Sequence, residues 1–144
     1  MINDKITVLF VCIQNSARSQ MAEKFLNEMG KGRFIAESAG IEPGNLNPFV
    51  VTAMNEIGLN ISENKTKSVF DLFKEGKSFD FVITVCDREA AEKCPIFPGR
   101  ASRFHWDFKD PSSFVGADQE KLECTRKIRD GIKSRIKQFI DELI

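Results

Sequence analysis

Residues 8–26 read VLFVCIQNSARSQMAEKFL, and this stretch decides the fold. The apolar run Val8–Val11 predicts a buried strand that ends on Cys12. Residues 18–29 carry apolar side chains at helical spacing and Gly30 follows them, so a helix is predicted over that range. The stretch therefore predicts a strand, a tight loop and a helix, with a thiol at the loop entrance and Arg18 at its exit.

Similar patterns continue along the chain. Apolar runs predict strands at residues 5–11, 33–39, 79–85 and 102–106. Helices are predicted at residues 18–29, 69–74 and 119–143, and another begins at Asn47–Pro48 and is ended by Gly58. Because strands alternate with helices, we expect an α/β fold with a parallel sheet and helices on both faces. The chain has 144 residues and no linker, which predicts a single domain over residues 1–144.

The loop after Cys12 suits a tetrahedral anion. The N-terminus of the following helix presents unpaired backbone N–H groups, and the Arg18 guanidinium adds a cation at the same place. This positive field favours thiolate over thiol, so we expect Cys12 to be nucleophilic near neutral pH. Ser19 can donate a hydrogen bond to that thiolate, and Asn15 can brace the loop. The alternative is that Cys12 is only a buried strand residue and Arg18 only a surface residue, but their place at a strand-to-helix junction favours the anion loop. The residues predicted to hold the anion are Ile13, Gln14, Asn15, Ser16, Ala17, Arg18 and Ser19.

Composition and charge exclude several classes of function. The net charge is zero and charges of both signs are interspersed, so neither nucleic acid nor an anionic membrane is an expected partner. The N-terminus runs straight into the first strand, and no apolar stretch reaches membrane-spanning length, so we expect a cytoplasmic protein and a monomer. In that compartment, four cysteines favour catalysis or redox chemistry over a disulfide framework.

Two further cysteines follow the strand predicted at 79–85. If that strand lies beside the first, Cys12 and Cys86 share one sheet edge and reach disulfide distance after a modest loop shift. Residues 88–93 are strong helix formers, and a helix would place Cys86 and Cys94 roughly 12 Å apart, too far for a disulfide. We therefore predict a redox switch, in which this segment is helical when reduced and looped out when oxidised. Taken singly, each thiol also has a simpler interpretation, in which Cys86 is an ordinary buried residue at a strand end and Cys94 is a loop thiol.

The C-terminal third contains candidates for a general acid. Asp110 precedes Pro111 and is held extended, which suits a general acid that reaches over the anion loop. The same dipeptide is also typical of a turn or cap before the last helix, and Asp107 competes for the role. His105 is the only histidine and is given no role, and Cys124 is predicted to be a buried, inert residue of the last helix.

Taken in order, the segments VCIQNSARSQMAE, ESAGI, VITVCDREAAEKCPIFPG and HWDFKDPSS give the chain a family resemblance. The chain resembles the thioredoxin-coupled arsenate reductases, which share the low-molecular-weight protein tyrosine phosphatase fold. The resemblance covers essentially the whole chain. It implies three α/β/α layers around a four-stranded parallel sheet in the order 2-1-3-4. It also implies the reduction of arsenate to arsenite for arsenical resistance, recycled by thioredoxin or a glutaredoxin-like thiol donor and without a bound cofactor.

The resemblance implies roles for individual residues. Cys12 attacks arsenate, and Cys86 then attacks Cys12, which releases arsenite and forms a Cys12–Cys86 disulfide. Cys94 attacks Cys86 and moves the disulfide to Cys86–Cys94, where the external thiol reduces it. Arg18 holds the oxyanion, and Asp110 matches the general acid of the family.

Three departures from the family pattern are informative. Ser112 and Ser113 stand where related phosphatases carry tyrosines, and the chain has no Tyr, which favours a small inorganic oxyanion over phosphotyrosine. Ala17 stands where many relatives have a second loop cysteine, which leaves Cys86 as the resolving thiol.

The third departure concerns a metal ion. Some related reductases bind potassium beside the loop through Asn, Glu, Ser and Asp, and Asn15, Glu23 and Ser38 match three of these residues. Lys67 falls near the position of the Asp and can place its ammonium where the ion would lie. We therefore expect no metal ion and no potassium dependence.

Two alternatives stay open at this point. A low-molecular-weight phosphatase acting on phosphotyrosine or other phosphomonoesters would need Cys12, Arg18 and Asp110, but neither Cys86 nor Cys94. A non-enzymatic redox or oxyanion sensor would bind the anion and switch the 86–94 segment without turnover.

Overall fold

The computed structural model describes residues 5–86, 92–97, 99 and 101–143. The described strands form a four-stranded sheet, with all pairs parallel, in the order β2-β1-β3-β4. The predicted α/β class and strand order are therefore confirmed. The elements along the chain are β1 (Ile6–Cys12), α1 (Arg18–Met29), β2 (Phe34–Gly40), α2 (Pro48–Asn55), α3 (Val69–Lys74), β3 (Phe81–Thr84), β4 (Ser102–His105), the 3₁₀ turn η1 (Pro111–Ser113) and α5 (Asp118–Glu142).

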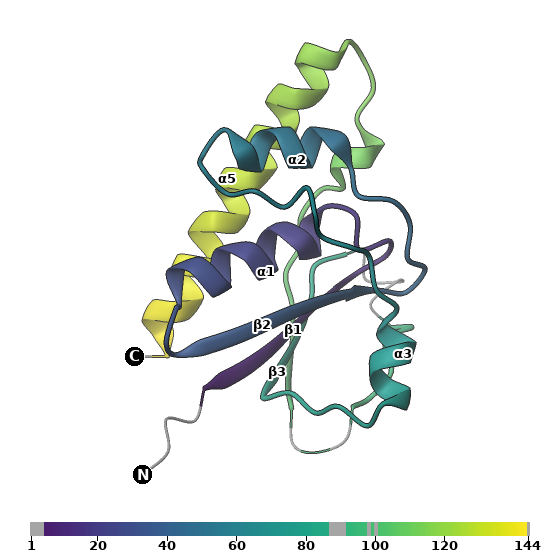
Figure 1. Ribbon diagram of the computed structural model, residues 1–144, viewed down its shortest axis with the longest axis vertical. Helices are drawn as coiled ribbons and strands as arrows, with labels where there is room; N and C mark the ends of the chain where they lie inside the picture. The colour runs from purple at the N-terminus through teal and green to yellow at the C-terminus, as the bar shows by residue number, and fades with distance from the viewer. Residues whose placement is uncertain (1–4, 87–91, 98, 100, 144) are drawn as a thin grey trace.

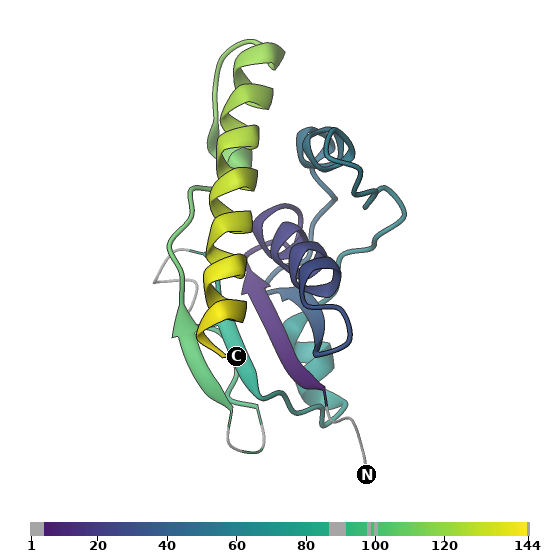
Figure 2. The same cartoon turned by 90° about the vertical axis from the view of Figure 1, so that its left-hand side faces the viewer.

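Helices cover both faces of the sheet, which confirms the three predicted layers (Figure 1). Side chains of β1 alternate between the faces, because successive residues of a strand point in opposite directions. Phe10 and Cys12 enter a core cluster with α1, α2 and α5, while Leu9 and Val11 enter a second cluster with α3. Figure 2 shows α1 and α5 side by side along one face of the sheet. Among the described residues, every helix is too short or too polar to cross a bilayer.

Most predicted boundaries are close to the observed ones. The ranges 18–29 and 69–74 are those of α1 and α3, and the first two strands and the last helix differ by one residue at each end. The strand predicted at 79–85 is shorter, because β3 covers only Phe81–Thr84. Of the helix predicted over 88–93, residues 88–91 lie outside the described residues, and Glu92 and Lys93 form a turn.

The prediction that Cys124 is buried is wrong, because this thiol is half-buried. The row of isoleucines on α5 does face the core at Ile132 and Ile136, but Ile128 is only partly buried. The N-terminal turns of α5 extend past the end of the sheet (Figure 2), so this part of the helix does not pack on the sheet.

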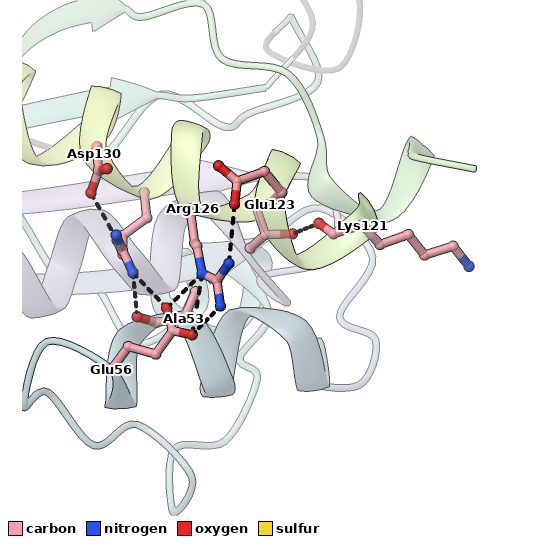
Figure 3. Close-up of polar contacts among 8 residues, drawn as sticks. Ala53, Glu56, Lys121, Glu123, Arg126 and Asp130 are labelled. Atoms are coloured by element: carbon pink, nitrogen blue, oxygen red, sulfur yellow. Dashed lines mark hydrogen bonds and ion pairs between the residues drawn. The ribbon is translucent and has the colours of Figure 1, made fainter. Parts of the chain in front are cut away.

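A cluster of charged side chains holds α2 against this part of α5 (Figure 3). Glu56, at the end of α2, accepts hydrogen bonds from Arg126 at 2.6 Å and from Arg129 at 3.1 Å. Arg129 is buried and also donates to the backbone oxygen of Ala53 at 2.8 Å. The hydrogen bond from the Arg126 guanidinium lowers the pKa of Glu56 below its ordinary value. The cluster fixes α2, whose first residues border the anion loop.

Candidate active site

The anion loop, residues 13–17, lies at the carboxyl end of the central strand β1, where sheets of this kind bind ligands. Cys12 at the end of β1 is 2% exposed, and its Cα pairs with that of Gly40 on β2. A Cβ atom at Gly40 would come within 2.8 Å of the backbone of Ile13, Gln14 and Asn15. Glycine at this position therefore lets the loop fold back over the strand end.

Among the described residues, two groups form hydrogen bonds with the sulfur of Cys12. Ser19 Oγ lies 2.8 Å from Cys12 Sγ, and the backbone N–H of Asn15 donates to the sulfur at 3.2 Å. Asn15 has a φ of 55°, a left-handed conformation that asparagine tolerates better than most residues and that aims its N–H into the loop. In the part of the chain that the structure describes, no side chain caps α1, whose N-cap residue is Ala17, and its first turn has no acidic residue. The helix N-terminus is therefore open to an anion.

Arg18 is buried, and the loop that precedes η1 holds its guanidinium. Nη1 donates to the backbone oxygen of Phe108 at 3.0 Å, and Nη2 lies 3.6 Å from Asp110 Oδ2. Nε is buried and has no hydrogen-bond partner among the described residues. An unsatisfied buried donor costs roughly 1–3 kcal/mol, which a bound oxyanion at this point would recover.

The two side-chain oxygens of Asp110 have different partners, which together fit both interpretations of its sequence context. Its Oδ1 accepts a hydrogen bond from Ser112 N at 2.9 Å and so caps η1, while Oδ2 faces Arg18. Asp107, the competing candidate, is 83% exposed and lies 3.3 Å from His105 Nε2. His105 also contacts Thr84 Oγ1 at 2.8 Å. The structure therefore places Asp110, and not Asp107, beside Arg18.

Cys86 lies close to Cys12 in the fold. Val11 pairs with Thr84, and Val85 N donates to the backbone oxygen of Val11 at 2.8 Å, so Cys86 lies one residue beyond the position opposite Cys12. Adjacent strands lie about 4.8 Å apart, and the Val85 hydrogen bond continues this register beyond the end of β3 to the residue before Cys86. Both cysteines belong to the same buried cluster, and the four cysteines of the chain are in the thiol form.

Cys94 lies on the other side of the sheet. It is 5% exposed and packs in the second core cluster with Val69 and Leu72 of α3. Burial raises the pKa of the Cys94 thiol, and the charge of Arg103 opposes this only in part. The structure thus brings Cys12 and Cys86 together and keeps Cys94 apart from them.

The residues predicted to replace a potassium site form a small charged cluster. Ser38 Oγ donates to Glu23 Oε1 at 2.6 Å, and burial raises the pKa of Glu23. The ammonium of Lys67 lies 3.4 Å from Glu37 Oε1, and its charge partly opposes the effect of burial on Glu23. The backbone N–H of Lys67 donates to Asn15 Oδ1 at 3.0 Å. The absence of potassium dependence stays a prediction.

A pocket of about 300 Å³ opens beside the loop. Gln14 and Ser16 of the loop line it, together with Phe49 of α2 and Phe114 after η1. Asn47 Nδ2 donates to Ser112 Oγ at 3.1 Å and joins the two walls. Ser112 therefore lies at the rim of the site.

Two groups at the site were not foreseen from the sequence. The backbone oxygen of Phe108 anchors Arg18, and a backbone acceptor leaves no signal in residue types. Gln20 is buried and hydrogen-bonds to Asn15. The sequence feature that could have indicated this role is a polar residue between Ser19 and Met21, in a helical turn whose residues are buried.

Comparison with known proteins agrees with this geometry. A family model described as low molecular weight phosphotyrosine protein phosphatase matches residues 7–144. An arsenate reductase of Shouchella clausii is 40% identical over 138 residues, which are 95% of this chain and 96% of that protein.

Solved structures give the same result. A structure described as an arsenate reductase in the phosphate binding state has a TM-score of 0.75 at 28% identity, over 96% of this chain and 99% of its own. A thioredoxin-dependent arsenate reductase of Corynebacterium glutamicum has a TM-score of 0.71 at 26% identity, over 99% of this chain and 63% of its own. The chain therefore belongs to the low molecular weight phosphotyrosine protein phosphatase family, and its relatives within that family include proteins named arsenate reductase.

Proposed function

We propose that this protein reduces arsenate to arsenite by a relay of three cysteines. The observation that carries the proposal is the pair Cys12 and Cys86, which share one buried cluster at the adjacent ends of β1 and β3. A hydrolase built on this loop needs the first thiol only, whereas a reductase needs a second thiol that can reach the first.

In the first step, the thiolate of Cys12 attacks arsenic, a sulfur–arsenic bond forms, and one oxygen of arsenate leaves as water. That oxygen already carries one proton as an As–OH group, and Asp110 supplies the second, because Arg18 holds the anion and the Asp110 carboxyl group lies next to that guanidinium. The Nε atom of Arg18 and the open N-terminus of α1 hold the remaining oxygens.

In the second step, the thiolate of Cys86 attacks the sulfur of Cys12. The electron pair of the sulfur–arsenic bond stays on arsenic, which leaves as arsenite, and a Cys12–Cys86 disulfide forms. Two thiols thus supply the electron pair that converts As(V) to As(III), and no electron carrier is bound. In the third step Cys94 attacks Cys86, and Cys12 leaves as a thiolate.

The third step requires the chain between Cys86 and Cys94 to rearrange, because Cys94 is buried against α3 in the thiol form. The resulting Cys86–Cys94 disulfide is reduced by an external thiol protein of the thioredoxin or glutaredoxin class. The thioredoxin-dependent relative from Corynebacterium glutamicum supports this choice of reductant. We further propose that the protein acts as a cytoplasmic monomer without a bound metal ion.

The test is arsenate turnover with a thioredoxin system, measured for the wild type, Cys86→Ser and Cys94→Ser. Cys86→Ser should show no turnover, whereas Cys94→Ser should stop after one turnover with a Cys12–Cys86 disulfide that mass spectrometry can detect. Cys124→Ser is the matched control and should behave as the wild type, because this half-buried thiol lies on α5. Normal turnover in both variants would refute the relay.

The same variants separate the alternatives. A phosphatase would hydrolyse an aryl phosphate at wild-type rates in Cys86→Ser and would show no thiol-dependent arsenate turnover. A sensor would bind arsenate and form a disulfide but would not release arsenite repeatedly.

A further inference from the structure

The side chain of Gln20 lies beside the anion loop and is almost completely buried, with 1% of its surface exposed. Its nitrogen Nε2 donates toward the backbone oxygen of Asn15 at 3.1 Å, Asn15 Oδ1 at 3.2 Å and the backbone oxygen of Lys65 at 3.3 Å. Its oxygen Oε1 accepts a hydrogen bond from Asn64 Nδ2 at 3.0 Å. Gln20 thus ties the loop to residues 64–65.

These contacts bear on the conformation of Asn15. A non-glycine residue keeps a left-handed backbone only where its surroundings hold it there. Asn15 is fully buried, and Gln20 contacts both its backbone oxygen and its side-chain oxygen. The left-handed conformation in turn directs the Asn15 N–H to Cys12 Sγ. Gln20 therefore holds the residue that supplies one donor to the sulfur.

The second donor to the sulfur is Ser19, and the directions of the neighbouring hydrogen bonds identify it. Asn15 Oδ1 accepts from Gln20 Nε2 and from the backbone N–H of Lys67, which can only donate, so the orientation of the Asn15 amide is determined. Its Nδ2 then donates to Ser19 Oγ at 2.8 Å. Because Ser19 Oγ accepts there, its own proton is left for Cys12 Sγ at 2.8 Å.

We propose that Gln20 is a positioning residue that keeps Cys12 reactive by acting through Asn15 and Ser19. Without the Gln20 amide, Asn15 loses the contacts that hold its backbone and one of the two donors that orient its side chain. Both donors to the sulfur then lose their alignment, and the thiolate loses the hydrogen bonds that favour it. This inference deepens the proposed function and rests on it, because the attack on arsenate starts from that thiolate.

The test is the rate at which iodoacetamide alkylates Cys12 as a function of pH, followed on the Cys12 peptide by mass spectrometry. Gln20→Met keeps the length of the side chain and removes its donor and acceptor. We expect the pH midpoint of alkylation to rise and the rate below the midpoint to fall about tenfold, since hydrogen bonds to a charged group are at stake. Gln20→Glu places an acceptor where the donor was and should shift the midpoint in the same direction.

The matched control is Asn27→Leu on the same helix. Asn27 donates to the backbone oxygen of Ala36 at 3.1 Å and accepts from its N–H at 2.8 Å, so this variant loses a comparable pair of hydrogen bonds away from the loop. It should lower the melting temperature without moving the alkylation midpoint. An unchanged midpoint in folded Gln20→Met, or an equal shift in Asn27→Leu, would overturn the proposal.

A milder variant covers the case in which neither Gln20 variant folds. Asn64→Ala removes only the donor to Gln20 Oε1, and Asn64 is partly exposed. Slower alkylation of Cys12 in this variant would support the proposal, and wild-type alkylation would overturn it. The assay uses neither arsenate nor thioredoxin, so a wild-type protein without arsenate turnover would refute the proposed function alone.

Discussion

The close approach of the anion loop to Gly40 allows a sharp test of how the site is built. In Gly40→Ala the new Cβ would lie 2.8 Å from three backbone atoms, which are Asn15 N, Gln14 C and Ile13 O. Ordinary contacts to a Cβ atom are about 3.4 Å or longer, so all three atoms must withdraw together. A backbone segment cannot turn aside as the end of a side chain can, and the loop must shift as a unit.

The expected cost follows from that geometry. Overpacking against a rigid neighbour typically costs about 1–3 kcal/mol, which for a chain of this size lowers the melting temperature by roughly 3–10 °C. The shift also moves Asn15 N away from Cys12 Sγ, with which it forms a 3.2 Å hydrogen bond. We expect saturating phosphate to raise the melting temperature of the wild type, and this rise should be smaller in Gly40→Ala, because the loop no longer matches a tetrahedral anion.

Two other glycines provide graded controls for the same substitution. At Gly44 the nearest atoms belong to the Gln14 side chain, at 3.3 Å, which can move aside. At Gly131 in α5 the nearest atom is Phe108 Cε1 at 3.6 Å, so alanine there should stabilise the helix by about 0.5–1 kcal/mol. Thermal unfolding with and without phosphate measures all three variants. A melting temperature of Gly40→Ala at or above that of Gly44→Ala, with the phosphate effect intact, would refute the reasoning.

Three further predictions concern charged groups. Asp110→Asn removes the acid beside Arg18 and should lower arsenate turnover about 10²- to 10⁴-fold; steady-state kinetics with turnover near wild type would contradict that role. Arg126 lowers the pKa of Glu56, so this ion pair adds stability above the ordinary glutamate pKa, and that stability is lost as the pH falls through the folded pKa. Urea unfolding should show Glu56→Gln destabilised near neutral pH and equal to the wild type in acid, and a pH-independent difference would argue against this. Burial raises the pKa of Glu23, so the wild type loses stability as the pH rises from the ordinary glutamate pKa through the folded pKa. Glu23→Gln should be more stable than the wild type near neutral pH but not in acid. Equal melting temperatures of the two proteins from acid to neutral pH would contradict this direction of the effect.

Sequence reasoning succeeded where the signal is local or periodic. The run from Val8 to Val11, followed by Cys12, Arg18 and a helical stripe, predicted β1, the loop and α1, because strand burial and helix amphipathicity repeat at short range. Asn47 before Pro48 predicted the start of α2, where the Asn47 side chain accepts a hydrogen bond from Phe49 N.

It failed where the outcome depends on how distant segments are placed. Cys124 continues an apolar row on α5, but the periodicity of a helix cannot tell where its neighbours end. The sequence predicted that Cys94 lies apart from Cys86 in the reduced form, but not that Cys94 is buried in the second core cluster beside α3. The carbonyl of Phe108 that anchors Arg18 is a backbone group, which residue types do not reveal.

The separation of Cys94 from the other two thiols orders the proposed relay. Cys12 and Cys86 meet in one cluster, so the first disulfide needs little movement. Cys94 is buried on the opposite face, and burial raises the pKa of its thiol, so it cannot compete with Cys86 for Cys12 while the fold is reduced. Cys94 can act in the proposed relay only after its side chain leaves the second core cluster. The burial of Cys94 thus protects the reduced enzyme from a premature disulfide, and the chain that carries it must move before the reductant can act.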